Sequence, residues 1–210
     1  MTNVGLLYVG AVLFVNGLLL IGVIPGKSAA ILNFFVGAMQ VVFPTIVLSQ
    51  AAGDTAVILG ASGLYLFGFT YLYVGFNQVF DLPGEGLGWF SLFVAFCAVV
   101  FAVLQFTAVG DPVFGVIWLL WAVLWFLFFL VLGLNKEHLT IFTGWFTAIV
   151  AHVTGTIPAL FLLAGAYAPT AAAAWAVAAG GVISLAVAFV MARRTWRPTA
   201  SPGMPAEVAA

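Results

Sequence analysis

The hydrophobic pattern of this chain is a series of long apolar stretches separated by short breaks. Each stretch is at least as long as the roughly 20 apolar residues that an α-helix needs to cross a lipid bilayer. The breaks carry Pro, Gly, Asn or charged residues, which end helices. The pattern therefore predicts an all-α membrane protein, a bundle of seven transmembrane helices. The stretches cover residues 4–24, 29–49, 56–80, 88–109, 113–134, 141–167 and 171–192.

Composition agrees with this pattern and excludes several classes of function. Of 210 residues, 65% are hydrophobic and 5% charged, whereas soluble domains carry about 25% charged residues. The net charge of −1 gives no reason to expect nucleic acid as a partner, and membrane lipid is the expected surrounding. The single Cys97 lies in an apolar stretch, and the sequence has no metal-ligand cluster and no catalytic or phosphate-binding motif. We expect no metal, no cofactor and no enzymatic activity.

Basic residues follow only the odd-numbered stretches. Lys27 follows the first, Lys136 the fifth, and Arg193, Arg194 and Arg197 the seventh. Because cytoplasmic loops carry an excess of Lys and Arg, this distribution predicts an N-terminus outside and a C-terminus inside. All acidic residues before the C-terminal tail fall in the breaks, so none is expected at membrane depth.

Ion-coupled carriers usually keep ionisable side chains within their spans. His152 is the one candidate in this sequence. It would either relay protons or form a hydrogen bond with a neighbour on its own helix, and the second alternative is favoured because no acidic partner lies at depth.

Aromatic residues form a second pattern. Trp118, Trp121 and Trp125 fall at about 0°, 300° and 340° around a helix, which is one narrow stripe. Phe67 and Tyr71 are four residues apart and share a face of the third span. Tight core packing is the alternative explanation for each ring. A narrow stripe of rings also suits the faces of a small planar solute.

Uncharged polar residues complete the candidate chemistry. In lipid they need partners, either on a neighbouring helix or in a transported solute; for Asn16 and Asn33 a bond between helices is favoured. Rings against the faces of a solute and neutral groups at its edges suit a small, planar, uncharged polar molecule. The polar residues within the spans are Asn16, Asn33, Gln40, Tyr71, Asn77, Gln78, Gln105, Thr154 and Thr156.

Several segments, spread over about residues 4–165, resemble the urea channel and amide transporter family. The resemblance implies six twisted helices per protomer, each protomer with its own pore, in a homohexameric ring in the inner membrane. It also implies passive uptake of urea or short amides for a cytoplasmic urease or amidase. The segments are LLYVG at 6–10, NFFVG at 33–37, LFGFTYLY at 66–73, WFSLFVA at 89–95, IWLLWAVLW at 117–125 and IPA at 157–159.

The resemblance further implies which side chains line the pore. Phe114 stands where some members have another tryptophan, and Asn16, Asn77 and Thr156 are possible polar pore contacts. The residues that match the aromatic lining and the aliphatic constrictions are Phe67, Tyr71, Trp118, Trp121 and Trp125, with Leu6, Leu13 and Leu124.

Three features depart from the acid-gated member of that family. Val150 replaces a glutamate, and Thr156 replaces a tryptophan before Ile-Pro. The loop at 51–55 is short and has no histidine, so gating by outside pH is not expected. A seventh helix follows the six-helix core. The expected parts are a channel core (1–167), an additional transmembrane helix (168–192) and a disordered cytoplasmic tail (193–210).

The sequence thus predicts a passive facilitator for urea or short-chain aliphatic amides. Two alternatives stay open. One is a proton-coupled amide carrier that uses His152, and the other is a membrane scaffold for an amidase or urease complex that transports nothing. The sequence does not choose between urea and longer amides.

Overall fold

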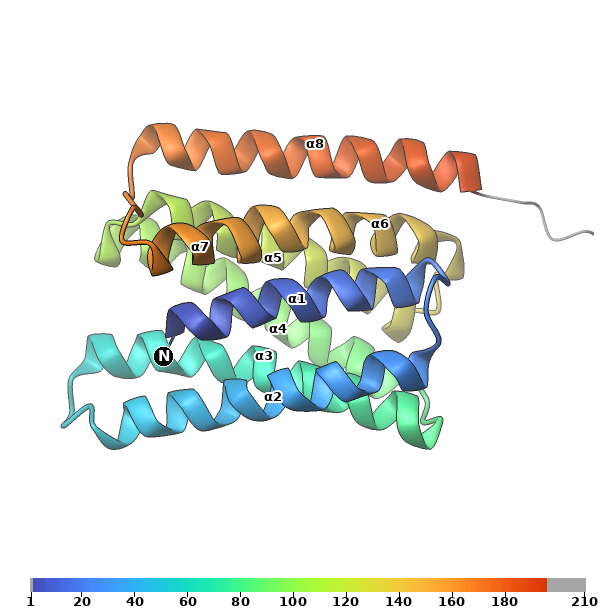
Figure 1. The fold of residues 1–210 in the computed structure, drawn as a ribbon, viewed down its shortest axis with the longest axis horizontal. Helices are drawn as coiled ribbons and strands as arrows, with labels where there is room; N and C mark the ends of the chain where they lie inside the picture. Colours follow the sequence, from blue (N-terminus) through green and yellow to red (C-terminus); the bar gives the residue numbers. More distant parts are fainter. Residues whose placement is uncertain (1, 196–210) are drawn as a thin grey trace, which may run out of the picture.

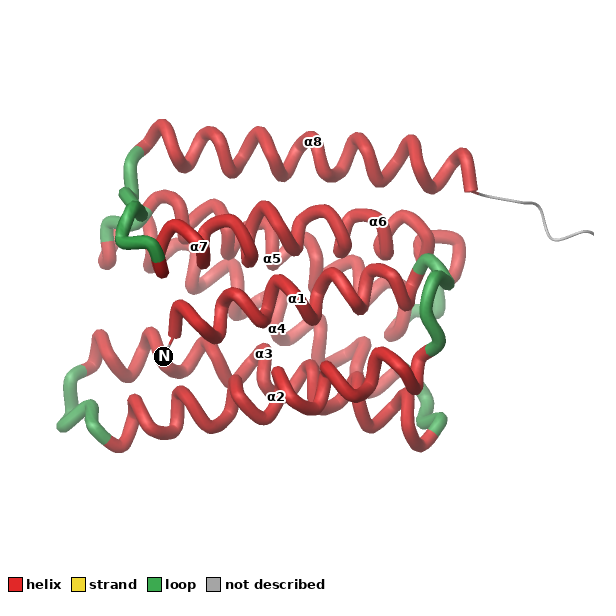
Figure 2. Tube along the Cα trace, viewed as in Figure 1, coloured by secondary structure: helices red, strands yellow, loops and turns green. Residues whose placement is uncertain are grey.

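A computed structural model describes residues 2–195, which are almost entirely helical (Figures 1 and 2). The expected sixth span is made of two α-helices joined by a π-helical turn, so the seven spans contain eight α-helices. These are α1 (Thr2–Leu20), α2 (Gly26–Ser49), α3 (Thr55–Phe80), α4 (Glu85–Leu104), α5 (Pro112–Phe128), α6 (Thr140–Ala151), α7 (Ile157–Leu163) and α8 (Ala171–Thr195).

Seven helical segments are long and apolar enough to cross a membrane, which confirms the predicted number of spans. Two of them end earlier than expected, at Leu20 and Leu163. In both places a glycine takes the left-handed conformation, Gly22 with φ 78° and Gly165 with φ 68°. The N–H of the residue after each glycine bonds to a carbonyl five residues back, at 2.9 Å. This glycine stop signal is a common helix end, and the sequence analysis passed over it.

The last helix is longer than expected. It runs through Arg193 and Arg194 to Thr195, past the predicted end at residue 192. Two arginines in the last turn suit the negative end of the helix dipole. The remainder of the predicted tail, 196–210, lies outside the described residues.

Helices α1 to α6 form a closed ring. Each contacts the next one along the chain, and α6 returns to contact α1. Because consecutive helices are antiparallel, α1, α3 and α5 all start at the same end of the bundle (Figure 1). The six-helix core thus has an axis that all its helices surround.

Close contact between α1 and the sixth span depends on two glycines. A Cβ built on Gly155 would lie 2.7 Å from the Cα of Gly10, closer than real side chains allow. Small residues at such positions let helix backbones approach closely in lipid, where packing drives association.

Helix α8 lies outside the ring, against α5 and α6 (Figure 1). Its small residues Ala174, Ser184 and Ala188 are buried, whereas Trp175 is 76% exposed. The additional helix therefore covers part of the core without joining the ring.

Charged side chains lie at the two ends of the bundle. The four basic residues within 2–195 all lie at one end of the bundle, the end at which α1, α3, α5 and α8 finish. Asp54 and Asp111 lie at the opposite end, where they cap α3 and α5 by accepting backbone N–H bonds. All five Asp and Glu residues of the described chain lie at or beside helix ends, as predicted.

Candidate functional site

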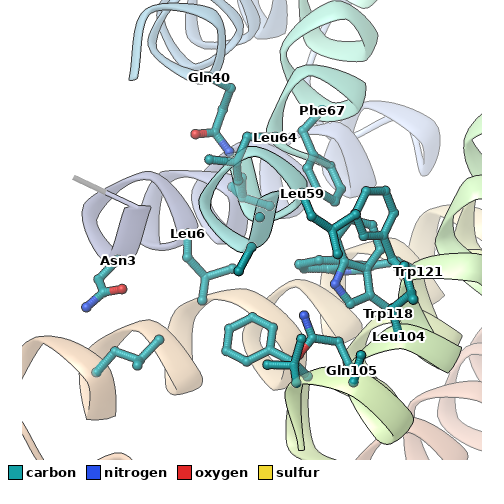
Figure 3. A pocket seen from close by; sticks show the side chains of 18 of the residues that line it. Asn3, Leu6, Gln40, Leu59, Leu64, Phe67, Leu104, Gln105, Trp118 and Trp121 are labelled. Atoms are coloured by element: carbon teal, nitrogen blue, oxygen red, sulfur yellow. The ribbon is translucent and has the colours of Figure 1, made fainter. Parts of the chain in front are cut away.

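The larger cavity inside the ring has a volume of about 740 Å³ (Figure 3). Asn3, Thr55 and Gln105 line it at the helix ends, on the side where α1, α3 and α5 start. Deeper in the bundle its walls are apolar and aromatic and include Phe67 and Trp121. The cavity therefore has polar side chains near the helix ends and aromatic rings deeper in the bundle.

A smaller cavity, of about 20 Å³, lies further along the axis. Its volume is close to that of a single water molecule. Its lining combines apolar groups with hydroxyl and amide groups: Leu13, Asn16, Thr70, Tyr71, Val74, Leu87, Ser91, Trp125 and Phe128.

The two cavities follow one another along the three parallel helices. On α1 the lining changes from Leu6 and Val9 in the larger cavity to Leu13 in the smaller one. On α3 it changes between Phe67 and Thr70, and on α5 between Trp121 and Trp125. The lining changes in the same order along all three parallel helices, so the cavities lie in series.

Aromatic rings fill the space between the cavities. The Phe67 ring centroid lies 4.7 Å from that of Trp121 and 5.0 Å from that of Trp125, with edge-to-face geometry in both pairs. Phe67 also contacts Trp118 at 5.6 Å and stacks with Tyr71 at 6.4 Å. All five residues are at least 93% buried, and we call them the aromatic cluster. The predicted tryptophan stripe and the Phe67/Tyr71 pair thus meet in one place.

Two threonine hydroxyls fix the indole rings. Trp121 Nε1 donates to Thr154 Oγ1 at 3.0 Å, and Trp125 Nε1 donates to Thr70 Oγ1 at 3.3 Å. Each threonine donates its own proton to the carbonyl four residues earlier in its helix, at 2.7 Å. Because each hydroxyl proton is used in this way, the oxygen is free to accept from an indole. Thr70 is not among the residues predicted from the sequence, since no sequence pattern shows which indole a threonine will face.

A π-helical turn at His152–Thr156 brings Thr154 to the cluster. Within this turn the Ile157 N–H bonds to the His152 carbonyl, five residues back. Pro158 follows and has no N–H to continue an α-helical ladder. Such turns are frequent at functional sites. Here Thr154 is buried while the His152 side chain is exposed on the outside of the bundle.

The aliphatic candidates occupy different places. Leu6 and Phe114 line the larger cavity, and Leu13 lines the smaller one. Leu124 is fully buried in the core cluster but lines neither cavity.

The candidate polar contacts are mostly engaged within the protein. Asn16 lines the smaller cavity, but its amide forms two reciprocal bonds with Asn33, at 2.9 and 2.7 Å, which is the favoured bond between helices. Asn77 Nδ2 donates to the Pro83 carbonyl at 3.3 Å. Asn77 lines neither cavity.

Thr156 and His152 bond to each other. The Thr156 hydroxyl lies 3.2 Å from His152 Nδ1 on the same helix, the alternative that the sequence analysis favoured for this histidine. Neither residue lines a cavity.

Two buried polar side chains in the lining have no partner among the described residues. The Tyr71 hydroxyl, in the smaller cavity, is one. The other is Gln40 in the larger cavity, which leaves both its amide oxygen and nitrogen unpaired. From the sequence, Gln40 was one of several polar residues within the spans. The structure distinguishes it, because it lines the larger cavity with both of its polar side-chain atoms unpaired within residues 2–195.

The lining carries no formal charge. No Asp, Glu, His, Lys or Arg within residues 2–195 lines either cavity. A charged solute would lose its hydration there without a compensating charge. The arrangement favours neutral solutes.

A tyrosine and an aspartate join two loops near the mouth of the larger cavity. The Tyr167 hydroxyl donates to the Asp111 carboxylate, with O–O distances of 2.7 and 2.8 Å. Asp111 also accepts from the Phe114 N–H at 3.0 Å. Burial, this hydrogen bond and the charge of Asp111 raise the pKa of the Tyr167 phenol above its ordinary value. The pair connects the loop before α8 to the start of α5.

Known proteins resemble this chain over most of its length. The family model for AmiS/UreI family transporters matches residues 1–166. A Rhodococcus erythropolis protein assigned as transporter protein AmiS2 is 59% identical over 178 residues, covering 84% of this chain and 86% of that protein. A Mycolicibacterium smegmatis protein assigned as a transporter of amidate substrates is 49% identical over 210 residues, covering 100% of this chain and 99% of that protein.

A solved structure shares the six-helix core. The urea channel of Helicobacter pylori in its closed state superposes with a TM-score of 0.73 and 33% identity, covering 80% of this chain and 100% of that chain. The family match, the relatives and the shared core agree with the resemblance seen in the sequence motifs. The chain belongs to the AmiS/UreI family of transporters.

Proposed function

We propose that this protein is a passive channel for urea or short-chain aliphatic amides. The solute moves along the axis of the six-helix ring from the larger cavity to the smaller one and passes between rings of the aromatic cluster. The observation that carries this proposal is the pair of cavities in series, separated by a buried aromatic cluster and lined without formal charge.

The lining suits solutes of this class. Urea and primary amides are planar and uncharged, so rings can flank their faces while hydroxyl and amide groups meet their edges. Contacts of this kind bind weakly, and conduction requires that a solute can leave as readily as it enters. The names of the relatives, a urea channel and a transporter of amidate substrates, support the same class.

Several residues are proposed as the pathway. Leu6 and Phe114 form the wall of the larger cavity, Leu13 that of the smaller one, and Asn16 a polar edge. Leu124, which is buried in the core, is proposed to lie outside the pathway, and so are Asn77 and Thr156. The narrowest part is formed by Phe67, Tyr71, Trp118, Trp121 and Trp125.

The proposed setting follows from charge and from the family. The basic residues lie at the end where α1, α3 and α5 finish. Following the positive-inside rule, we propose that the N-terminus and the larger cavity are on the outer side of the membrane. We propose an inner-membrane location, a homohexamer with one pathway per protomer, and a functional link to a cytoplasmic amidase or urease.

Flux into proteoliposomes tests the proposal. Stopped-flow light scattering should show rapid uptake of urea or acetamide down its gradient, with rates that are independent of membrane potential and of external pH between about 5 and 8, since no lining group titrates there. Dependence on a proton or sodium gradient would support a coupled carrier instead. Copurification with an amidase or urease but no flux would support a scaffold.

A further inference from the structure

A buried glutamine stands at the boundary between the larger cavity and the aromatic cluster. Gln40 of α2 is 1% exposed and lines the cavity with Leu6, Val9 and Phe67. In Figure 3 its side chain extends from α2 toward Leu64 and the interior of the cavity. These three residues are apolar, so the Gln40 amide is a polar group in an apolar part of the lining, beside a ring of the aromatic cluster.

The amide of Gln40 is free to bind. Its Nε2 and Oε1 atoms are both buried and have no partner in the part of the chain that the structure describes. A carboxamide has two N–H donors and a carbonyl acceptor, and buried groups of this kind are normally hydrogen-bonded. Asn33, on the same helix, pairs its amide with that of Asn16. Among the described residues, Asn77 leaves only its Oδ1 unpaired and donates from Nδ2. Gln40 differs from both because its oxygen and its nitrogen both lack a described partner.

The backbone next to Gln40 is shaped to hold this side chain. A Cβ built on Gly5 of α1 would come within 2.5 Å of Gln40 Oε1. A side chain at position 5 would thus displace the amide. On the other side, a Cβ on Gly68 would lie 3.0 Å from the backbone carbonyl oxygen of Gln40, so the backbones of α2 and α3 are close there. Gly5 leaves room for the side-chain amide, and Gly68 lets α3 pack against the backbone that carries it.

We propose that Gln40 selects for primary amides and urea by pairing with them through two hydrogen bonds. Its N–H donates to the carbonyl of the solute, and its carbonyl accepts the N–H that lies on the same side as that carbonyl. Primary amides and urea present both groups side by side. Secondary amides are trans, with the N–H and C=O on opposite sides, so they can form one of the two bonds. The pairing replaces hydration that the solute loses before it reaches Phe67. This inference rests on the proposed channel function and adds a selectivity residue to it.

Two isomeric solutes test the pairing. Propionamide and N-methylacetamide have the same atoms, and only propionamide can form both bonds. We expect Gln40→Met, which keeps the length of the side chain, to reduce propionamide permeability in proteoliposomes about fivefold to thirtyfold, the effect of losing one to two net hydrogen bonds. N-methylacetamide loses one bond at most, so its permeability should fall by a clearly smaller factor, about twofold to fivefold. Gln50→Met, an exposed site at the end of the same helix, is the matched control and should change neither rate.

Thermal stability separates binding from a structural role. Methionine has no amide to leave unpaired in the core, so Gln40→Met should keep or raise the Tm of the purified protein. A lower Tm would show that the amide has a structural partner, and the pairing would be wrong. An equal loss of both permeabilities, or no loss in either, would also overturn it.

Equilibrium binding separates this inference from the channel proposal. Saturation-transfer NMR on the wild-type protein should show contact with propionamide that Gln40→Met weakens and Gln50→Met does not. A wild-type protein that binds propionamide in this way but passes no solute would refute the channel while supporting the pairing. A wild-type protein that passes both isomers equally well would refute the pairing while supporting the channel.

Discussion

The indole nitrogen of Trp121 donates a hydrogen bond to the hydroxyl of Thr154, 3.0 Å away, across the interior of the bundle. This bond joins α5, which carries the tryptophan stripe, to the π-helical turn of the sixth span. It fixes the ring that faces the larger cavity and contacts Phe67. The shape of the proposed constriction thus depends on a threonine that does not line it.

Replacement of Thr154 by valine should therefore change transport. The two side chains have nearly the same shape, so the main loss is the bond to Trp121, which costs about 0.6 to 1.7 kcal/mol within a membrane. We expect a modest fall in Tm and a change of severalfold in urea permeability, both measured on the purified protein. Thr107→Val is the control, because the exposed Thr107 hydroxyl bonds only to the Val103 carbonyl among described partners. Equal effects of both variants would contradict a specific role of Thr154.

Phe67 is predicted to set the size limit of the pathway. It contacts three tryptophans between the two cavities, so Phe67→Leu should widen the constriction. We expect the permeability of butyramide to rise severalfold relative to urea, measured by stopped-flow light scattering. Removing buried volume should cost at least about 1 kcal/mol of stability. Phe69→Leu, at a site on the same helix that is 50% exposed, is the control and should leave the permeability ratio unchanged. If Phe67→Leu also leaves this ratio unchanged, Phe67 only packs in the core and does not limit solute size.

The Tyr167–Asp111 bond predicts a loss of stability in alkali. Burial, the hydrogen bond and the Asp111 charge raise the pKa of Tyr167 in the folded protein above the value of about 10 expected in the unfolded chain. The resulting stabilisation is present in full below about pH 10 and is lost as pH rises above that, because the unfolded chain then releases the proton first. Tyr167→Phe should thus lower Tm at pH 7, and its difference from wild type should shrink toward pH 11. The exposed Tyr8 provides a control substitution, Tyr8→Phe, which should show no such trend.

Removal of α8 should leave a working channel. The ring of α1 to α6 closes without it, and neither the larger nor the smaller cavity includes an α8 residue. A protein that ends at Ala168 should keep urea or acetamide flux within about twofold of the full chain, less than the effect of one lost hydrogen bond. Its Tm should fall, because the faces of α5 and α6 that α8 covers lose their packing. A folded truncated protein without flux would show that α8 takes part in transport.

The sequence could predict the site only as far as single helices allow. The tryptophan stripe follows from a period of 3.6 residues, and the structure places all three rings on the buried side of α5. The roles of Thr70, Thr154 and Gln40 do not follow from any period, because each depends on which group a different helix brings opposite. For Asn16, a bond to another helix could be expected from the sequence. Its partner Asn33 and its position beside the smaller cavity depend on how α1 and α2 pack.

The length of the apolar stretches and the positions of the charges by themselves determined that this chain crosses a membrane seven times. Both are properties of a single segment, so they can be read without knowing which other segment packs against it. Only the tertiary structure decided that six of these helices close into a ring and the seventh stays outside. Only the tertiary structure also aligned Phe67, Trp121 and Trp125 between two cavities and left the amide of Gln40 unpaired beside them. These are relationships between helices distant in sequence, and packing, close glycine contacts and the π-helical turn set them.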